Sequence, residues 1–102
     1  MDIEKLRECC RKNKILWSTH AASRIQQRGI LRIDVINCIM NGEIIEDYPT
    51  DYPHPSCLIF GYNMMNNRAV HVVVGYDGDN VFIITAYYPS AEKFFDDFKT
   101  RR

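Results

Sequence analysis

Two runs of β-branched residues joined by a short turn sequence constrain the fold of this chain most tightly. Residues 69–76 and 81–88 are rich in valine, isoleucine and tyrosine, and Asp77-Gly78-Asp79-Asn80 between them is typical of a hairpin turn. Strands are also predicted at residues 43–48 and 57–62, because the stretch between them holds three prolines that remove ladder donors.

Three helices are predicted before these strands, at residues 2–12, 19–28 and 32–41. Ser18 is suited to cap the second helix, and Gly29 suits the left-handed position after it, with Ile30 packing back on the helix. Gly42 ends the third helix. A last short helix is predicted to open at Pro89-Ser90.

Together these elements predict one α+β domain over residues 1–102, with N-terminal helices packed on a roughly four-stranded, mainly antiparallel sheet and a short C-terminal helix. No apolar run approaches the ~20 residues of a membrane helix, so we expect a cytoplasmic protein without a membrane partner. Cys38 and Cys57 lie in apolar runs and are predicted to be small core residues. No metal or cofactor motif is present, and no cofactor is expected.

Charge is distributed unevenly along a chain whose formal net charge is zero. Residues 1–33 carry eight Lys or Arg against three Asp or Glu, whereas residues 34–98 carry two against ten. This asymmetry can create a basic face, which phosphate binding requires. Two unrelated solvated faces would give the same charge pattern.

The most informative residues are His20, Arg24 and Arg28, which fall at i, i+4 and i+8 and therefore share one face of the second helix. Guanidinium groups hold phosphate bidentately, and an imidazole can move a proton near neutral pH. The alternative is a solvated face whose arginines pair with the acidic half of the chain.

His71 is the one strongly polar residue in its valine-rich strand, where a titratable ring needs a partner. It is predicted to be either a satisfied core or edge histidine or a catalytic one. If Tyr76 pairs with Val81, Thr85 and Tyr87 point to the face opposite His71. A one-residue bulge would reverse this arrangement, so the sequence leaves it open.

Several motifs resemble the bacterial domain-of-unknown-function family 4258. They are His20-Ala21 through Arg24, then Arg28-Gly29-Ile30, the run from Asn41 to Pro49, His71-Val72-Val73, and Ile84-Thr85-Ala86-Tyr87 with Pro89. The resemblance covers about residues 17–102. One departure is Leu31, where relatives have a helix-capping serine.

The resemblance implies a small RNase toxin of the barnase, colicin and RelE type, with an active site on an antiparallel sheet. Carried over by position, the implied catalytic residues are His20, Arg24, Arg28, His71, Thr85 and Tyr87. RNA would be the substrate, and an antitoxin protein would be the partner.

Two functional hypotheses follow. The first is a metal-independent endoribonuclease that cleaves RNA by 2′-hydroxyl attack, with the two histidines sharing the proton transfers and the arginines holding phosphate. The second is a non-catalytic module that binds a protein or nucleic acid, which the tyrosine-rich segments favour. These tyrosines are Tyr48, Tyr52, Tyr62, Tyr87 and Tyr88.

Overall fold

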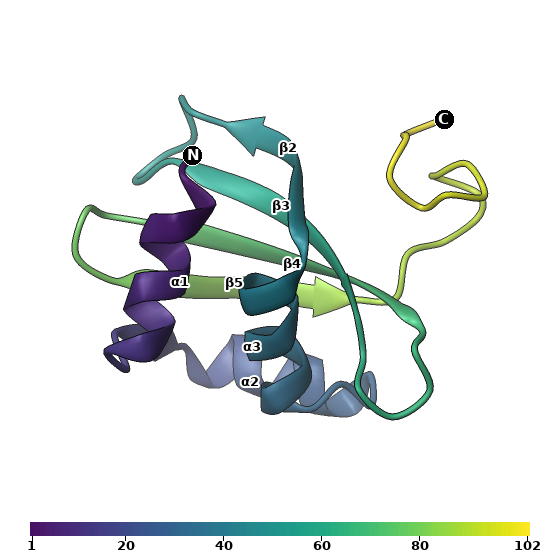
Figure 1. Cartoon of the computed structure of the whole chain (residues 1–102), viewed down its shortest axis with the longest axis horizontal. Coiled ribbons are helices and arrows are strands. Elements are labelled where there is room, and N and C mark those ends of the chain that lie inside the picture. The colour runs from purple at the N-terminus through teal and green to yellow at the C-terminus, as the bar shows by residue number, and fades with distance from the viewer.

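Three helices lie on one face of a five-stranded sheet in the computed structural model, which describes residues 1–102 (Figure 1). The helices are α1 (Ile3–Arg11), α2 (Thr19–Gln27) and α3 (Arg32–Asn41). The strands are β1 (Ile15–Trp17), β2 (Glu43–Tyr48), β3 (Ser56–Tyr62), β4 (Ala69–Tyr76) and β5 (Val81–Tyr87). The α+β class is as predicted, and the three helices precede the four predicted strands, but the unpredicted β1 lies between α1 and α2.

The sheet has the order β1-β5-β4-β3-β2, and one strand more than predicted. The four predicted strands pair antiparallel with their neighbours, as expected. The added strand, β1, pairs parallel with the start of β5, from Ile15 opposite Val81 to Trp17 opposite Ile83. A three-residue strand is too short to show a period of two, which explains why the sequence did not reveal it.

The predicted helix ends are formed by local capping. The Ser18 hydroxyl accepts the Ala21 N–H at 3.0 Å at the start of α2. After α2, Gly29 has φ +73° and the Ile30 N–H bonds the Ile25 carbonyl at 3.1 Å, the pattern of a Schellman motif. α3 begins after Leu31 without a side-chain cap.

A β-bulge fixes the register of the central hairpin. Tyr76 does pair with Val81, but the pairing shifts so that Val73 faces Thr85 while Val74 faces Ile83. The shift places His71 opposite Tyr87. Of the two arrangements that the sequence left open, the structure therefore has the bulged one, with His71, Thr85 and Tyr87 on the same face of the sheet.

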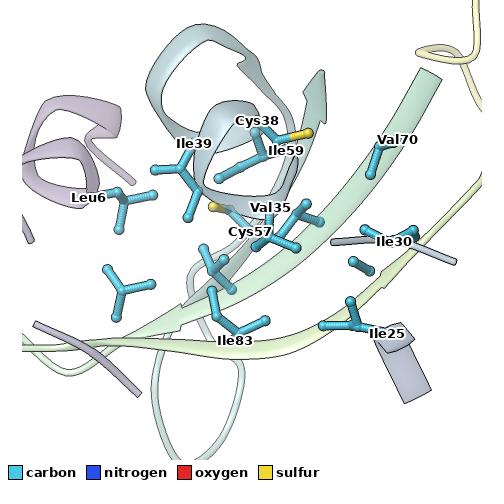
Figure 2. Packing of buried hydrophobic residues seen from close by; sticks show 14 of the residues in the cluster. Leu6, Ile25, Ile30, Val35, Cys38, Ile39, Cys57, Ile59, Val70 and Ile83 are labelled. Carbon is cyan, nitrogen blue, oxygen red and sulfur yellow. The ribbon is translucent and has the colours of Figure 1, made fainter. Parts of the chain in front are cut away.

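The main core fills the space between the helices and the sheet, where side chains from both layers converge (Figure 2). α1 contributes Leu6, α3 contributes Val35 and Ile39, and the strands contribute alternate residues such as Ile59 and Val72, all fully buried. Alternation follows from the period of two, so the next residues along each strand face the other side. Cys38 and Cys57 belong to this core, as predicted.

Residues 89–102, here called the C-terminal strap, cover one end of the other face of the sheet. The predicted C-terminal helix was wrong. One turn follows Ser90, whose carbonyl accepts the Phe94 N–H at 3.0 Å. The chain then leaves helical geometry, because the Asp97 carboxylate accepts backbone N–H groups two and three residues on and Phe98 has φ +55°. Phe94 instead packs inward and is 1% exposed.

The close approach of α3 to β3 depends on a glycine. A Cβ atom at Gly61 would lie 2.8 Å from the Cys38 Sγ atom and 2.9 Å from its Cα atom, whereas one at Gly75 would meet nothing nearer than 3.6 Å.

We expect Gly61→Ala to lower the free energy of unfolding by ~1–3 kcal/mol through overpacking. Gly75→Ala, the matched strand control, should change it by less; equal effects in urea unfolding would contradict this packing.

Candidate active site at the edge of α2 and β5

The basic face of α2 is exposed and has no acidic partners. His20, Arg24 and Arg28 are all exposed. None of the seven ion pairs in the structure includes a residue of α2 or Arg28. The arginines therefore do not pair with the acidic half of the chain, and their charge is available to an anion.

Arg28 connects the C-terminal end of α2 to the outer edge of β5. Its Nη1 atom donates to the Thr85 Oγ1 atom and to the Ala86 carbonyl oxygen, both at 2.9 Å. This carbonyl is free to accept because β1 pairs with β5 only as far as Ile83. The two hydrogen bonds hold the guanidinium group in one place, which favours specific phosphate binding.

Tyr87 lies two residues beyond Thr85 on the same face and is half-buried. Its hydroxyl is 3.4 Å from the His71 Nδ1 atom, and the two rings meet edge to face with centroids 5.4 Å apart. Burial raises the pKa of Tyr87, and the positive charges of Arg101 and Arg28 oppose that shift. The phenol therefore keeps its proton at neutral pH and can donate it in a hydrogen bond.

His71 is fully buried beneath Tyr87, and both of its ring nitrogens have partners. The Nε2 atom is 2.6 Å from the Phe98 carbonyl oxygen, which can only accept, so Nε2 carries the hydrogen. Burial lowers the pKa of His71, so the ring is neutral at pH 7 and Nδ1 can accept the Tyr87 hydroxyl. His71 thus orients Tyr87 and does not itself reach solvent.

The C-terminal strap encloses His71 from the side opposite the core. The Phe94 ring meets the His71 ring edge to face at 4.6 Å. Arg101 anchors the strap to β2 through two hydrogen bonds to the Glu46 carboxylate, at 3.1 and 2.9 Å. This contact with Arg101 lowers the pKa of Glu46. Glu46 and Arg101 are 55 residues apart in the chain, so no local sequence pattern links them.

The structure brings together four of the six predicted site residues. Arg28, Thr85 and Tyr87 form a continuous line, here called the α2–β5 seam, and His71 supports it from below. His20 and Arg24 lie along the same face of α2, but no hydrogen bond or ion pair joins either side chain to the seam. No hydrogen bond or ring contact joins His20 to His71, so the two histidines do not form one proton relay in this structure.

Two residues that the sequence did not single out as a pair extend the seam. The Arg68 guanidinium lies 3.7 Å above the centre of the Tyr88 ring, a cation–π contact. The Tyr88 hydroxyl in turn donates to the Gly29 carbonyl at 3.4 Å, directly after Arg28. Arg68 has no carboxylate partner either. Its position in the loop before β4 gave no periodic signal that would have linked it to α2.

Groups of three or more His, Cys, Asp or Glu side chains that could hold a metal ion are absent. The helices are also too short and too polar to cross a membrane.

Burial of a neutral histidine predicts a pH-dependent stability. Burial lowers the pKa of His71 in the folded protein below 6.5, the ordinary value that it has in the unfolded chain. At pH values between the folded and the unfolded pKa, the unfolded chain therefore binds more protons than the folded one. Stability should therefore fall as the pH drops below 6.5, before the carboxylates titrate. His71→Gln, which keeps a donor for Phe98, should flatten this dependence in urea unfolding between pH 7.5 and 5. If His71→Gln unfolds with the same pH dependence as the wild type, His71 is not the group that makes stability depend on pH.

Comparison with known proteins gives one match. The family model described as "Domain of unknown function (DUF4258)" matches residues 17–88, which hold α2, α3 and all of the sheet except the first two residues of β1. No curated protein and no solved structure matches the chain. The matched segment spans more than half of the 102 residues and includes His20, Arg24, Arg28, His71, Thr85 and Tyr87. The chain therefore belongs to the DUF4258 family.

Proposed function

We propose that this protein is an endoribonuclease of the toxin type, which binds RNA at the α2–β5 seam and cleaves it by 2′-hydroxyl attack without a metal ion. The observation that supports this proposal best is the set of arginines without acidic partners, of which Arg28 is fixed against Thr85 and Ala86. Unpaired guanidinium groups in a fixed position are what a phosphate diester requires.

The chemistry assigns a role to each exposed group. Attack of the 2′-oxygen on the adjacent phosphorus needs a base for the hydroxyl proton and an acid for the departing 5′-oxygen. His20, the exposed imidazole on the basic face, takes the 2′-hydroxyl proton as the base and delivers it to the departing 5′-oxygen as the acid. Arg24 and Arg28 bind the phosphate oxygens and stabilise the charge that grows on them in the transition state.

Tyr87 supplies a neutral hydrogen-bond donor at the end of the seam. Its raised pKa keeps the phenol protonated and uncharged. The single hydroxyl hydrogen is directed at the His71 Nδ1 atom in this structure, so Tyr87 donates to a phosphate or to the departing oxygen only when that hydrogen turns from His71 toward the substrate. His71 acts as a positioning residue, because it is buried and reaches the substrate only through the Tyr87 hydroxyl. This differs from a mechanism in which His71 and His20 exchange protons with RNA directly.

The second candidate is a non-catalytic binding module. It is favoured because no hydrogen bond or ion pair joins His20 to the seam. It is also favoured by the exposed side chains of Tyr52, Tyr62, Met64 and Met65, which suit an interface. The same arginine-rich face would then bind RNA without cutting it, or another protein would cover the exposed tyrosines and methionines.

RNA cleavage distinguishes the two candidates. Purified protein incubated with mixed cellular RNA and a chelator should cut it, and Arg24→Ala should lower the rate about 100-fold through loss of one charged donor. His20→Ala should lower it similarly. Arg11→Ala is the matched control, because Arg11 is an exposed helical arginine on α1 and pairs with Glu8. Arg11→Ala should cleave normally.

Two outcomes of the cleavage assay would count against this proposal. Cleavage that survives both His20→Ala and Arg24→Ala would overturn the site. RNA binding without cleavage, measured on correctly folded protein, would support the binding module instead.

A toxin-type enzyme should also act in cells. Induced expression should arrest bacterial growth, and His20→Ala should restore growth at equal protein levels. Normal growth with abundant wild-type protein and no neutralising antitoxin bound to it would contradict the toxin assignment.

A further inference from the structure

A polar cleft lies between the end of α3, the end of β3 and the loop before β4, and β4 separates β3 from the strand that carries the α2–β5 seam. Its volume is about 500 Å³, enough for a small planar ligand. Amide and aromatic side chains dominate the lining, with one ion pair at the rim. The lining residues that matter are Asn37, Asn41, Asn67, Phe60, Tyr62 and Lys99.

The cleft is lined by asparagines whose side-chain amides are only partly used in hydrogen bonds. Asn37 bridges two partners, because its Nδ2 atom donates to the Tyr62 carbonyl at 3.1 Å and its Oδ1 atom accepts from the Asn41 Nδ2 atom at 2.7 Å. The Asn41 Oδ1 atom and the whole Asn67 amide have no partner within the protein. Asn67 has φ +58°, a left-handed conformation that asparagine tolerates better than most residues.

Tyr62 belongs to the lining of the same cleft. Tyr62 is 45% exposed, and its ring meets the Phe60 ring at 78° with centroids 5.2 Å apart. Because the two rings meet edge to face, the contact with Phe60 leaves part of the Tyr62 ring exposed for stacking. An exposed ring beside unpaired amides offers both of the contacts that hold an unstacked nucleobase, stacking and edge hydrogen bonds.

The charge at the cleft suits a base better than a phosphate. Lys99 is the one cationic residue in the lining, and its Nζ atom is 2.7 Å from the Glu43 carboxylate. This ion pair leaves the cleft without a free positive charge. A phosphate would find its cation already paired, whereas a neutral heterocycle would not need one.

The cleft is also linked to the seam by hydrogen bonds. The Asn63 Nδ2 atom, at the cleft, is 3.4 Å from the Tyr88 hydroxyl, which bonds the Gly29 carbonyl next to Arg28. Arg68 covers Tyr88 between the two sites. A single RNA strand that places a phosphate at Arg28 and a base in the cleft would run past Arg68.

We propose that this cleft binds one unstacked nucleobase of the RNA strand, with adenine preferred. The base stacks on Tyr62, and the Asn67 amide bonds its edge. Asparagine can accept from the adenine N6 amino group while it donates to N7, which accounts for the preference. The RNA context rests on the proposed function, but base binding in the cleft can be measured without cleavage.

The test is titration of the ¹⁵N-labelled full chain with adenosine, guanosine, cytidine and uridine, which carry no phosphate. Adenosine should shift the amide signals of Tyr62 and Asn67 and bind most tightly. Tyr62→Leu should weaken binding about tenfold or more through loss of stacking, while Tyr62→Phe, which keeps the ring, should bind like the wild type. Asn67→Gly, which keeps the positive φ, should remove the preference for adenosine.

The titration tests base binding in the cleft separately from the proposed nuclease activity. Shifts confined to other surfaces, or equal weakening by Tyr62→Leu and Tyr62→Phe, would overturn the cleft assignment. RNA cleavage with no nucleoside binding in the cleft would leave the proposed function standing without this inference. Adenosine binding in the cleft of a protein that does not cut RNA would support the cleft and reject the nuclease.

Discussion

The bulge at Ile84 determines the side of the sheet to which Thr85 and Tyr87 of β5 point. With regular pairing from Tyr76 and Val81, Thr85 and Tyr87 would face away from His71. The extra residue reverses the side of the sheet to which the residues after Ile84 point. Tyr87 therefore contacts His71, and Thr85 contacts Arg28. Bulges re-aim side chains in this way beside functional sites. The seam exists because of one residue that has no partner on β4.

The two faces of the sheet then serve different purposes. The face toward the helices is apolar and fully packed, and it supplies the main core (Figure 2). The opposite face carries His71, which the C-terminal strap seals through Phe94 and the Phe98 carbonyl. A buried neutral imidazole holds the Tyr87 hydroxyl, and the exposed basic face of α2 lies at the edge nearest to it. Positioning groups are thus buried, while binding groups are exposed.

Local chemistry explains which parts of the structure the sequence could predict. The ends of α3, β2 and β4 follow from capping, glycine and turn residues close by, and the alignment of His20, Arg24 and Arg28 follows from helical periodicity. Features that depend on distant partners were not predictable. The partner of His71 depended on a bulge, β1 is held by β5 far along the chain, and Arg101 meets Glu46 across 55 residues.

The most direct test of the α2–β5 seam as an RNA site is NMR titration with a 2′-O-methylated RNA oligonucleotide, which can bind but cannot be cleaved through its 2′-oxygen. The account predicts that the largest shifts fall on His20, Arg24, Arg28 and Tyr87, and that affinity falls with rising salt as arginine–phosphate contacts require. Shifts elsewhere, or no binding at low salt by protein with native signals, would contradict it.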